Sequence, residues 1–270
     1  MAKGKTKSNY LGREGIVMYQ TQPSWDFIYE TSLIKHPKYN LGDRIVLPDG
    51  RVFRYAKTGA ANYDMNNDYA VRFGAVIGQQ YTEVKTSTVI GAKEVTITAD
   101  AHLGFAEDEL RGGYVIVYRD GGGGNTQFRG IIGNPVVAAA TDFTIYLDGG
   151  LDKATVGGTT GIEVWNNPYK GLVKASGVAI NGFAGKPAVQ ITTALTYFWV
   201  QTWGPCWLAH DSAVSPFTRD NQRACFTNLG AYTADYGYTN TMTAAGYCNQ
   251  IAGFTMLQTA GPFLCLTVNP

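Results

Sequence analysis

Short runs of β-branched and aromatic residues recur along the chain, and Gly, Asp or Asn residues separate them. This is typical of β-strands joined by tight turns. The intervals leave too little room for the helical crossovers that βαβ units need. We therefore expect a mainly β fold of antiparallel sandwich-like or barrel-like domains. The runs lie at 89–91, 95–98, 113–118, 143–147, 178–180, 189–191, 197–203 and 264–268.

Composition supports the same interpretation. Only 16% of the 270 residues are charged, against about 25% in an average globular protein. Glycine contributes 33 residues and tyrosine 17, which suits turns and strands better than helices. Hydrophobic residues make up 45% of the chain, so global disorder is excluded.

The clearest local signal is a hairpin. Strand-like runs at 43–47 and 51–55 flank Asp49-Gly50, a residue pair that tight hairpin turns favour. A run at 70–77 is too short for periodicity to distinguish a helix from a strand. The sequence predicts an extended arm over 1–40, a β-rich domain with an N-terminal hairpin over 41–170, and a C-terminal β domain over 171–270.

One five-residue pattern occurs twice, at 201–205 and 258–262, and both copies end in Gly-Pro. Proline has no backbone N–H to give to a strand ladder. We therefore expect each copy to be a sharp corner between strands.

The predicted arm carries isolated aromatic residues but no concentrated apolar cluster, and Pro23 and Pro37 interrupt it. Aromatic side chains spaced along an extended segment suit docking into pockets of a neighbour. We expect the arm to lie across an adjacent subunit, with packing on its own domain as the alternative. Its candidate interface residues are Tyr10, Tyr19, Trp25, Phe27 and Tyr29.

A second aromatic group, Tyr197 to Trp207, includes the candidate interface residues Trp199, Trp203 and Trp207. Alternate residues of a strand point to opposite faces. This group is therefore expected to form core and interface together. A sugar-stacking platform is the alternative.

Charge and apolar patterning restrict the classes of partner. The formal net charge is +1, which argues against a general nucleic-acid-binding surface. No apolar run approaches the roughly 18 residues of a membrane span, and no apolar stretch follows the basic start, so we expect no secretory signal. The four cysteines form no Cys-x-x-Cys pair, which favours free thiols.

Motifs for catalysis, cofactors or metals are incomplete. Gly121–Gly124 lacks the Lys-Ser/Thr ending of a phosphate loop. The segment 64–68 resembles the start of a calcium loop but lacks its glycine. His210, Asp211 and Ser212 are sequence neighbours and cannot form a catalytic relay, although a pair of Cys206 with His210 stays open. We expect no enzyme activity, no cofactor and no metal.

Three segments, taken in order, resemble the capsid cement or decoration proteins of tailed bacteriophages from about residue 40 to the C-terminus. They are Leu41-Gly42-Asp43-Arg44 through Asp49-Gly50-Arg51-Val52-Phe53-Arg54-Tyr55-Ala56; Gly112-Gly113-Tyr114-Val115-Ile116-Val117 with Asn167-Pro168-Tyr169-Lys170-Gly171; and Gly177-Val178-Ala179-Ile180 through Tyr197-Phe198-Trp199-Val200-Gln201-Thr202-Trp203-Gly204-Pro205.

The resemblance implies β-domains on the outside of a phage head that bridge neighbouring major capsid proteins. The expected partners are the major capsid protein and further copies of the chain, and the expected location is the capsid exterior after synthesis in the host cytoplasm. A surface with few charges also suits a subunit that neighbours cover. Two alternatives stay open: a tail or head–tail protein, and a carbohydrate-binding β-protein.

Overall fold

The computed structural model describes residues 25–74, 77–99, 104–118, 126–175, 182–209, 223–226, 231–234, 250–255 and 263–268. Over these ranges the fold is mainly β, as predicted, with one short 3-10 helix, η1 (Trp25–Tyr29), and no α-helix. The strands are β1 (Arg44–Val46), β2 (Val52–Thr58), β3 (Val71–Arg72), β4 (Ile77–Glu83), β5 (Glu94–Thr98), β6 (Tyr114–Tyr118), β7 (Gln127–Gly133), β8 (Asp142–Leu147), β9 (Gly161–Trp165), β10 (Lys170–Lys174), β11 (Phe183–Pro187), β12 (Tyr197–Trp207), β13 (Arg223–Phe226), β14 (Tyr232–Ala234), β15 (Gln250–Thr255) and β16 (Phe263–Thr267).

Five strands close into a barrel in the order β2-β10-β3-β11-β12, and β12 returns to pair with β2. The pair β10–β2 is parallel, and the other neighbours are antiparallel. β1 joins β2 as the predicted hairpin, which is confirmed, with Gly50 at a positive φ of 85° in its turn. The sheet continues from β12 through β16, β15, β13 and β14.

The second sheet has six antiparallel strands in the order β4-β9-β6-β7-β8-β5. Its two ends approach each other where Val84 bridges Ile97 and the Lys85 N–H donates to the Thr96 carbonyl at 2.7 Å. We call this sheet the near-barrel. Its strands alternate buried and outward residues, for example buried Val115 and Val117 in β6, and the inward side chains form one core.

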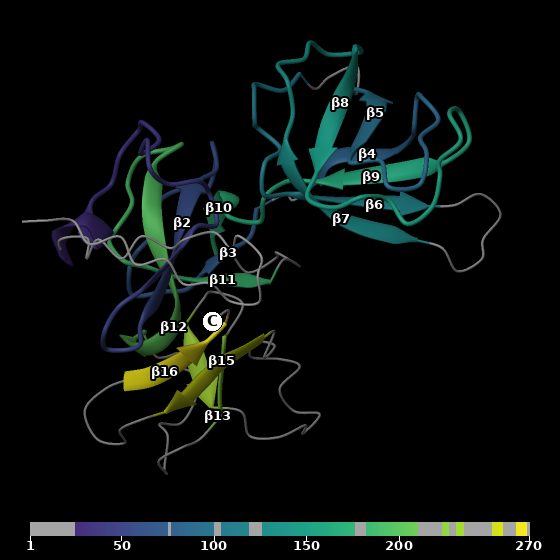
Figure 1. Cartoon of the computed structure of the whole chain (residues 1–270). Helices are drawn as coiled ribbons and strands as arrows, with labels where there is room; N and C mark the ends of the chain where they lie inside the picture. Colours follow the sequence, from purple (N-terminus) through teal and green to yellow (C-terminus); the bar gives the residue numbers. More distant parts are fainter. Residues whose placement is uncertain are drawn as a thin grey trace, which may run out of the picture.

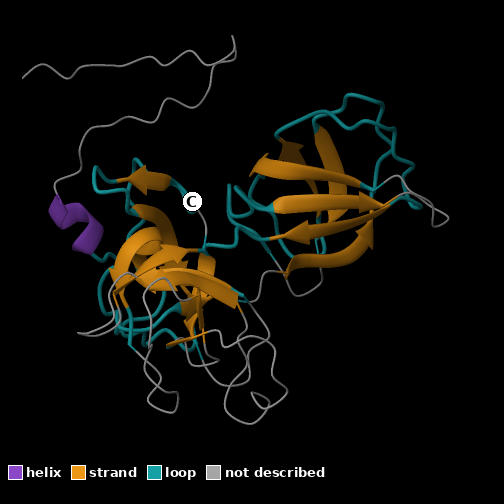
Figure 2. Ribbon diagram, turned by 90° about the horizontal axis from the view of Figure 1, so that it is seen from below, coloured by secondary structure: helices purple, strands orange, loops and turns teal. Residues whose placement is uncertain are grey.

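The near-barrel is inserted into the barrel sequence, because β4 to β9 lie between β3 and β10. Strand pairing therefore crosses the division expected at residue 170: β1, β2 and β3 share a sheet with β10 and the strands that follow it. The spacing of strand-like runs shows where strands lie but not which distant strands pair. Figures 1 and 2 show the two sheets side by side, joined by short connections.

A buried asparagine ties the two sheets together. The Asn167 Nδ2 donates to the carbonyl of Leu41 on the barrel side at 2.8 Å and lies 3.4 Å from the carbonyl of Arg111 on the near-barrel side. An ion pair adds to this contact, with the Lys170 Nζ 2.6 Å from a Glu109 carboxylate oxygen. These bonds restrict rotation of one sheet against the other.

The structure corrects two expected strands, 89–91 and 189–191, and resolves the ambiguous run at 70–77. In 189–191 only Ile191 pairs, as an isolated bridge with Met65. The run Val89–Gly91 forms an exposed turn, with Gly91 at a positive φ of 83°, instead of a strand. The run is short, and two apolar residues beside a glycine are as compatible with a turn as with a strand. The ambiguous run at 70–77 contains β3 and the first residue of β4 and no helix in its described part.

The Gly204-Pro205 pair is also not a corner, since β12 continues through it. A register shift between Gln201 and Trp203 marks a bulge, and pairing of β12 with β2 ends at Trp203. Pro205 therefore lies where β12 pairs on one edge only, with β16, a position that tolerates proline. The buried Gln201 Nε2 donates to the carbonyls of Trp203 (3.1 Å) and Pro205 (2.8 Å). The side-chain amide thus satisfies backbone groups that the bulge leaves unpaired. The second copy, 258–262, lies outside the described residues.

Gly204 is expected to be intolerant of a side chain. Its φ is +89°, and a Cβ there meets the Arg51 Cα and the Gly50 carbonyl oxygen, each at 2.9 Å. Gly204→Ala combines a strained φ with a backbone clash, so we expect a loss of about 3 kcal/mol or more in unfolding free energy. Urea unfolding of the purified protein measures it.

Gly50→Ala is the matched control, because Gly50 has a φ of +85° but nothing within 4 Å of an added Cβ. We expect it to cost about 1 kcal/mol, from backbone strain alone. Equal losses for the two variants would contradict the close approach of β12 to the hairpin.

Candidate functional site

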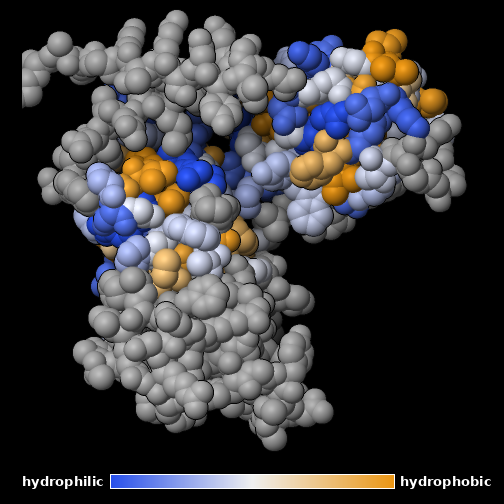
Figure 3. Space-filling view, turned by 60° about the horizontal axis from the view of Figure 1, so that its bottom comes forward, coloured by the Kyte–Doolittle hydropathy of each residue, from blue (hydrophilic) through white to orange (hydrophobic). Residues whose placement is uncertain are grey.

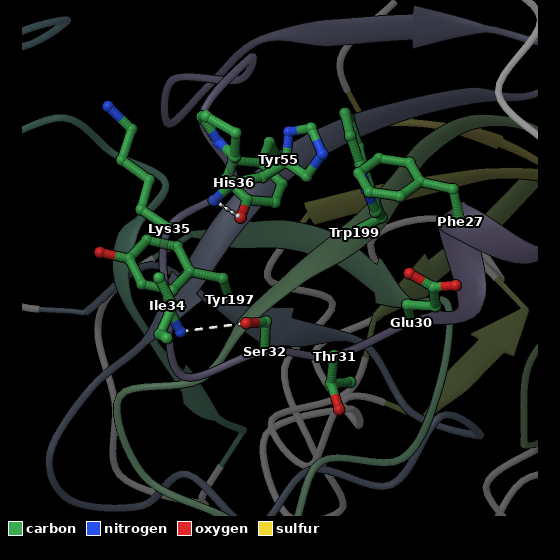
Figure 4. Close-up of a pocket in the computed structure, with 11 residues that line it drawn as sticks. Phe27, Glu30, Thr31, Ser32, Ile34, Lys35, His36, Tyr55, Tyr197 and Trp199 are labelled. Atoms are coloured by element: carbon green, nitrogen blue, oxygen red, sulfur yellow. Dashed lines mark hydrogen bonds between the residues drawn. The ribbon is translucent and has the colours of Figure 1, made fainter.

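A cavity of about 260 Å³ lies between the segment 27–37 and strands β2 and β12. In Figure 4 the Trp199 indole stands between the Phe27 ring and the His36–Tyr55 pair, while Ile34 and Lys35 lie on the far side. Aromatic rings and polar groups share the lining, which includes Phe27, His36, Tyr55, Tyr197 and Trp199 with Glu30, Thr31, Ser32 and Lys35. We call this cavity the aromatic pocket.

The pocket exists because the segment 25–40 folds onto its own barrel. Ile28 is fully buried in a cluster with Phe53 and Trp199. Ser32 and Tyr197 exchange two backbone hydrogen bonds, of 3.1 and 2.7 Å. This corrects the expected arm over 1–40: residues 25–40 pack on the same chain, since their apolar side chains find a site there, and residues 1–24 lie outside the described part.

Ring contacts hold the walls of the pocket. The Phe27 ring lies 4.9 Å from His36 and 5.7 Å from Trp199, centre to centre. Tyr55 and Tyr197 stack at 5.8 Å with 15° between their planes. Each such pair contributes about 0.5–1.5 kcal/mol beyond area burial. These contacts hold Phe27, His36, Tyr55, Tyr197 and Trp199 against one another.

Tyr55 connects the pocket walls through its hydroxyl. The His36 backbone N–H donates to the Tyr55 hydroxyl oxygen at 3.0 Å. Burial raises the pKa of Tyr55 above its ordinary value, although the hydrogen bond from His36 opposes the rise. The phenol is therefore neutral at neutral pH and acts as a fixed dipole.

Several polar groups of the pocket have no hydrogen-bond partner within the described ranges. The buried Trp199 indole N–H is one, and a buried donor left unpaired costs about 1–3 kcal/mol. The Glu30 carboxylate and the Thr31 hydroxyl also make no hydrogen bond there, whereas the Lys35 ammonium donates to the Asn40 side-chain oxygen at 2.8 Å. Glu30 and Thr31 are exposed to solvent, so the Trp199 N–H is the buried pocket group that lacks a partner in the described ranges.

The structure brings together two of the predicted interface residues, Phe27 and Trp199. Trp199 is only 1% exposed. It belongs to the core and cannot contact a neighbour directly, because the rings of Phe27, Tyr39 and Tyr55 pack around it. Its ring partners Tyr39 and Tyr55 were not predicted as site residues, since only the folded barrel brings them against Trp199.

The other predicted residues are dispersed. Tyr29 is exposed, and its hydroxyl accepts a hydrogen bond from the Arg51 guanidinium at 3.2 Å. Trp203 is half-buried at the bulge, and Trp207 is 45% exposed at the end of β12. Trp25 begins η1, and its side chain is not described; Tyr10 and Tyr19 lie outside the described residues.

Large apolar side chains are exposed on both sheets, and Figure 3 shows apolar surface over both parts of the molecule. On the barrel side, Leu33 and Ile34 flank the pocket, and Ile34 is 79% exposed. On the near-barrel, Phe128 is 57% exposed and stacks on Tyr114 at 5.0 Å beside the exposed Ile132. Apolar groups of this kind often mark interaction surfaces.

Cys206 and Cys265 are free thiols, as expected, whereas the Cys225 side chain is not described and Cys248 lies outside the described residues. Burial raises the pKa of Cys206 to about 12, although nearby Lys186 opposes the rise. A catalytic thiol needs a lowered pKa, so Cys206 is a poor nucleophile. His210, its suggested partner, also lies outside the described part.

In the described ranges, no three His, Cys, Asp or Glu side chains converge on a metal position, and no helix has the length and apolar character to cross a membrane. Comparison with family models, curated proteins and solved structures finds no match to this chain.

Trp199 is predicted to anchor the barrel. Trp199→Ala removes a fully buried indole and should lower the unfolding free energy by about 3–5 kcal/mol. Thermal or urea unfolding measures the loss. The control Trp207→Ala truncates an exposed indole on the same strand and should cost less than about 1 kcal/mol. A wild-type melting temperature for Trp199→Ala would contradict the assignment.

Cys206 should resist alkylation in the native protein. With its pKa near 12, the thiolate fraction at pH 8 falls by roughly three orders of magnitude relative to a free cysteine. Iodoacetamide labelling followed by peptide mass mapping gives the rate for each cysteine. The partly buried Cys265 is the internal comparison and should react faster. Equal Cys206 rates in native and urea-unfolded protein would refute this.

Proposed function

We propose that the chain is a structural virion protein, a capsid cement or decoration subunit that stabilises a tailed-phage head by bridging neighbouring major capsid proteins. The observation that carries the proposal is the exposure of apolar side chains on both parts of the molecule, Leu33 and Ile34 in a bend beside the barrel and Phe128 and Ile132 on β7 of the near-barrel. A subunit with exposed apolar side chains on each half is suited to bind two neighbours at once.

The link between the sheets supports this role. A bridge resists separation of its neighbours only if its two halves do not swing freely. The Asn167 hydrogen bonds and the Lys170–Glu109 ion pair join the halves directly. Force on one half is therefore transmitted to the other.

The energetics favour many modest contacts. Burying apolar surface contributes about 25 cal/mol per Å², so each exposed patch supplies a limited amount. Many subunits that tie adjacent capsomers act together, and local opening at one is resisted by the rest. The proposed partners are the major capsid protein and further copies of this chain, and the proposed location is the capsid exterior.

The exposure of each predicted interface residue decides whether it can contact a neighbour. Tyr29 and Trp207 are accessible for contact, whereas Phe27, Trp199 and Trp203 support the barrel from inside or at its rim. Tyr10, Tyr19 and Trp25 remain proposed contacts. A tail or head–tail role is the other proposal that an assembly subunit of this kind permits.

Particles that lack this protein should release DNA at lower temperature, and after milder osmotic shock, than complete particles. The double variants Leu33→Ser/Ile34→Ser and Phe128→Ser/Ile132→Ser should each lower particle occupancy while melting like the wild type, because they change exposed side chains. Dye access to DNA during heating is the readout, and added wild-type protein should restore resistance. Equal resistance with and without the protein would rule out a cement role.

A further inference from the structure

We propose that the outer face of β6, β7 and β9 docks a segment of the major capsid protein in which a cationic side chain lies beside apolar ones. The inference rests on the proposed capsid role and specifies what the near-barrel recognises there. The observation that carries it is an exposed carboxylate, Asp148, that lies between the exposed apolar side chains of Phe128 and Ile132. We call this surface the acidic aromatic face.

Strand alternation puts apolar side chains on this face. In β7 the buried Ile131 lies between Gly130 and Ile132, so Phe128, Gly130 and Ile132 are the outward positions. Tyr114 of β6 pairs with Gly130, and its ring stacks on Phe128 at 5.0 Å with 19° between the planes. Figure 1 shows β9, β6 and β7 side by side. Three large side chains are thus exposed on one surface.

A carboxylate occupies the space that the missing side chain of Gly130 leaves. The Gly130 N–H donates to the Asp148 Oδ1 at 3.0 Å, and a Cβ on Gly130 would collide with the Asp148 Oδ2. The carboxylate therefore covers Gly130 on the outward side, between Phe128 and Ile132. Asp148 is exposed and forms no ion pair in the described ranges. Its charge is thus open to a partner.

A second carboxylate borders the face. Glu163 of β9 pairs with Ile116 of β6, and Ile116 pairs with Phe128 of β7. Residues that are paired across antiparallel strands point to the same side, so Glu163 belongs to the same surface as Phe128. The Tyr118 hydroxyl donates to a Glu163 carboxylate oxygen at 2.9 Å, and Glu163 has no ion pair with any described residue.

The near-barrel carries an excess of negative charge. Residues 77–165 include eleven Asp and Glu against six Lys and Arg, although the whole chain has a net charge of +1. The cation of β7, Arg129, donates to the Gly150 carbonyl at 2.7 Å and pairs with Asp152 at 2.8 Å, so it is already engaged. Complementary charge across an interface therefore predicts a basic partner for this half.

A partner with both cationic and apolar groups satisfies the face. A purely apolar partner would bury the Asp148 carboxylate without a counter-charge, which is costly. A cationic side chain pairs with the carboxylate and is attracted by the faces of the Tyr114 and Phe128 rings. Apolar side chains next to the cation cover Phe128 and Ile132. An acidic partner, such as a nucleic acid, is repelled.

Binding of the purified full-length protein to particles that lack it tests this inference. The variant Asp148→Asn/Glu163→Gln removes two charges but keeps an oxygen to accept the hydrogen bonds from Gly130 and Tyr118. It should therefore melt like the wild type. We expect its affinity for the particles to fall at least about tenfold at low salt, and to change less than the wild-type affinity between about 50 and 500 mM NaCl.

The matched control is Asp142→Asn/Glu94→Gln, which removes two exposed carboxylates at β8 and β5 and changes the net charge equally. It should bind like the wild type. Equal affinities for the test variant and the control overturn the inference alone, whereas no binding by the wild type overturns the capsid role with it. Salt-sensitive self-association in sedimentation velocity that the test variant loses would assign the face to a second copy, which also overturns the inference.

Discussion

The pairing of β12 with β2 is the interaction on which the rest of the structure depends. It closes the five-stranded barrel, from Tyr197 opposite Lys57 to Trp203 opposite Val52. The closure buries Trp199 beside Tyr55, and these two residues form the inner wall of the aromatic pocket. Beyond the bulge at Gln201, whose side-chain amide donates to the carbonyls of Trp203 and Pro205, β12 leaves β2 and pairs with β16 from Trp203 to Trp207. β12 thus contributes to the barrel core, to the wall of the aromatic pocket and to the part of the sheet that extends beyond the barrel.

Closure of the barrel also determines the domain arrangement. Since β2 and β12 must meet, the strands between β3 and β10 form a sheet of their own, and the near-barrel is an insertion. Asn167 stands where the chain returns to the barrel and bonds to both sides. The result is a two-part body with apolar side chains on each part. This arrangement supports the proposed bridging role better than the aromatic content does.

The sequence was informative where the signal is local. Asp49-Gly50 specified the hairpin, and runs of β-branched and aromatic residues located strands such as β6, predicted at 113–118 and found at Tyr114–Tyr118. The pairing of strands distant in sequence was not predictable, because a strand-like run does not indicate which other strand it pairs with. The insertion of the near-barrel between β3 and β10 could therefore not be predicted. The sequence predicted a corner at Gly204-Pro205 and a strand at 89–91, and both predictions were wrong. The conformation at Gly204-Pro205 depends on the buried Gln201 amide, and Val89–Gly91 lies in an exposed turn. Phe27, Tyr197 and Trp199 could be named from the sequence as aromatic residues of interest, but their meeting with Tyr55 follows only from barrel closure.

The central claim, that this chain bridges capsid proteins on the outside of a phage head, is tested most directly by cryo-electron microscopy of purified particles. The account predicts density for both the barrel and the near-barrel on the outer head surface, with each copy touching two adjacent major capsid proteins. It also predicts that Ile34 and Phe128 are covered by those contacts. Density for this chain only in the tail, or its absence from complete particles, would contradict the account.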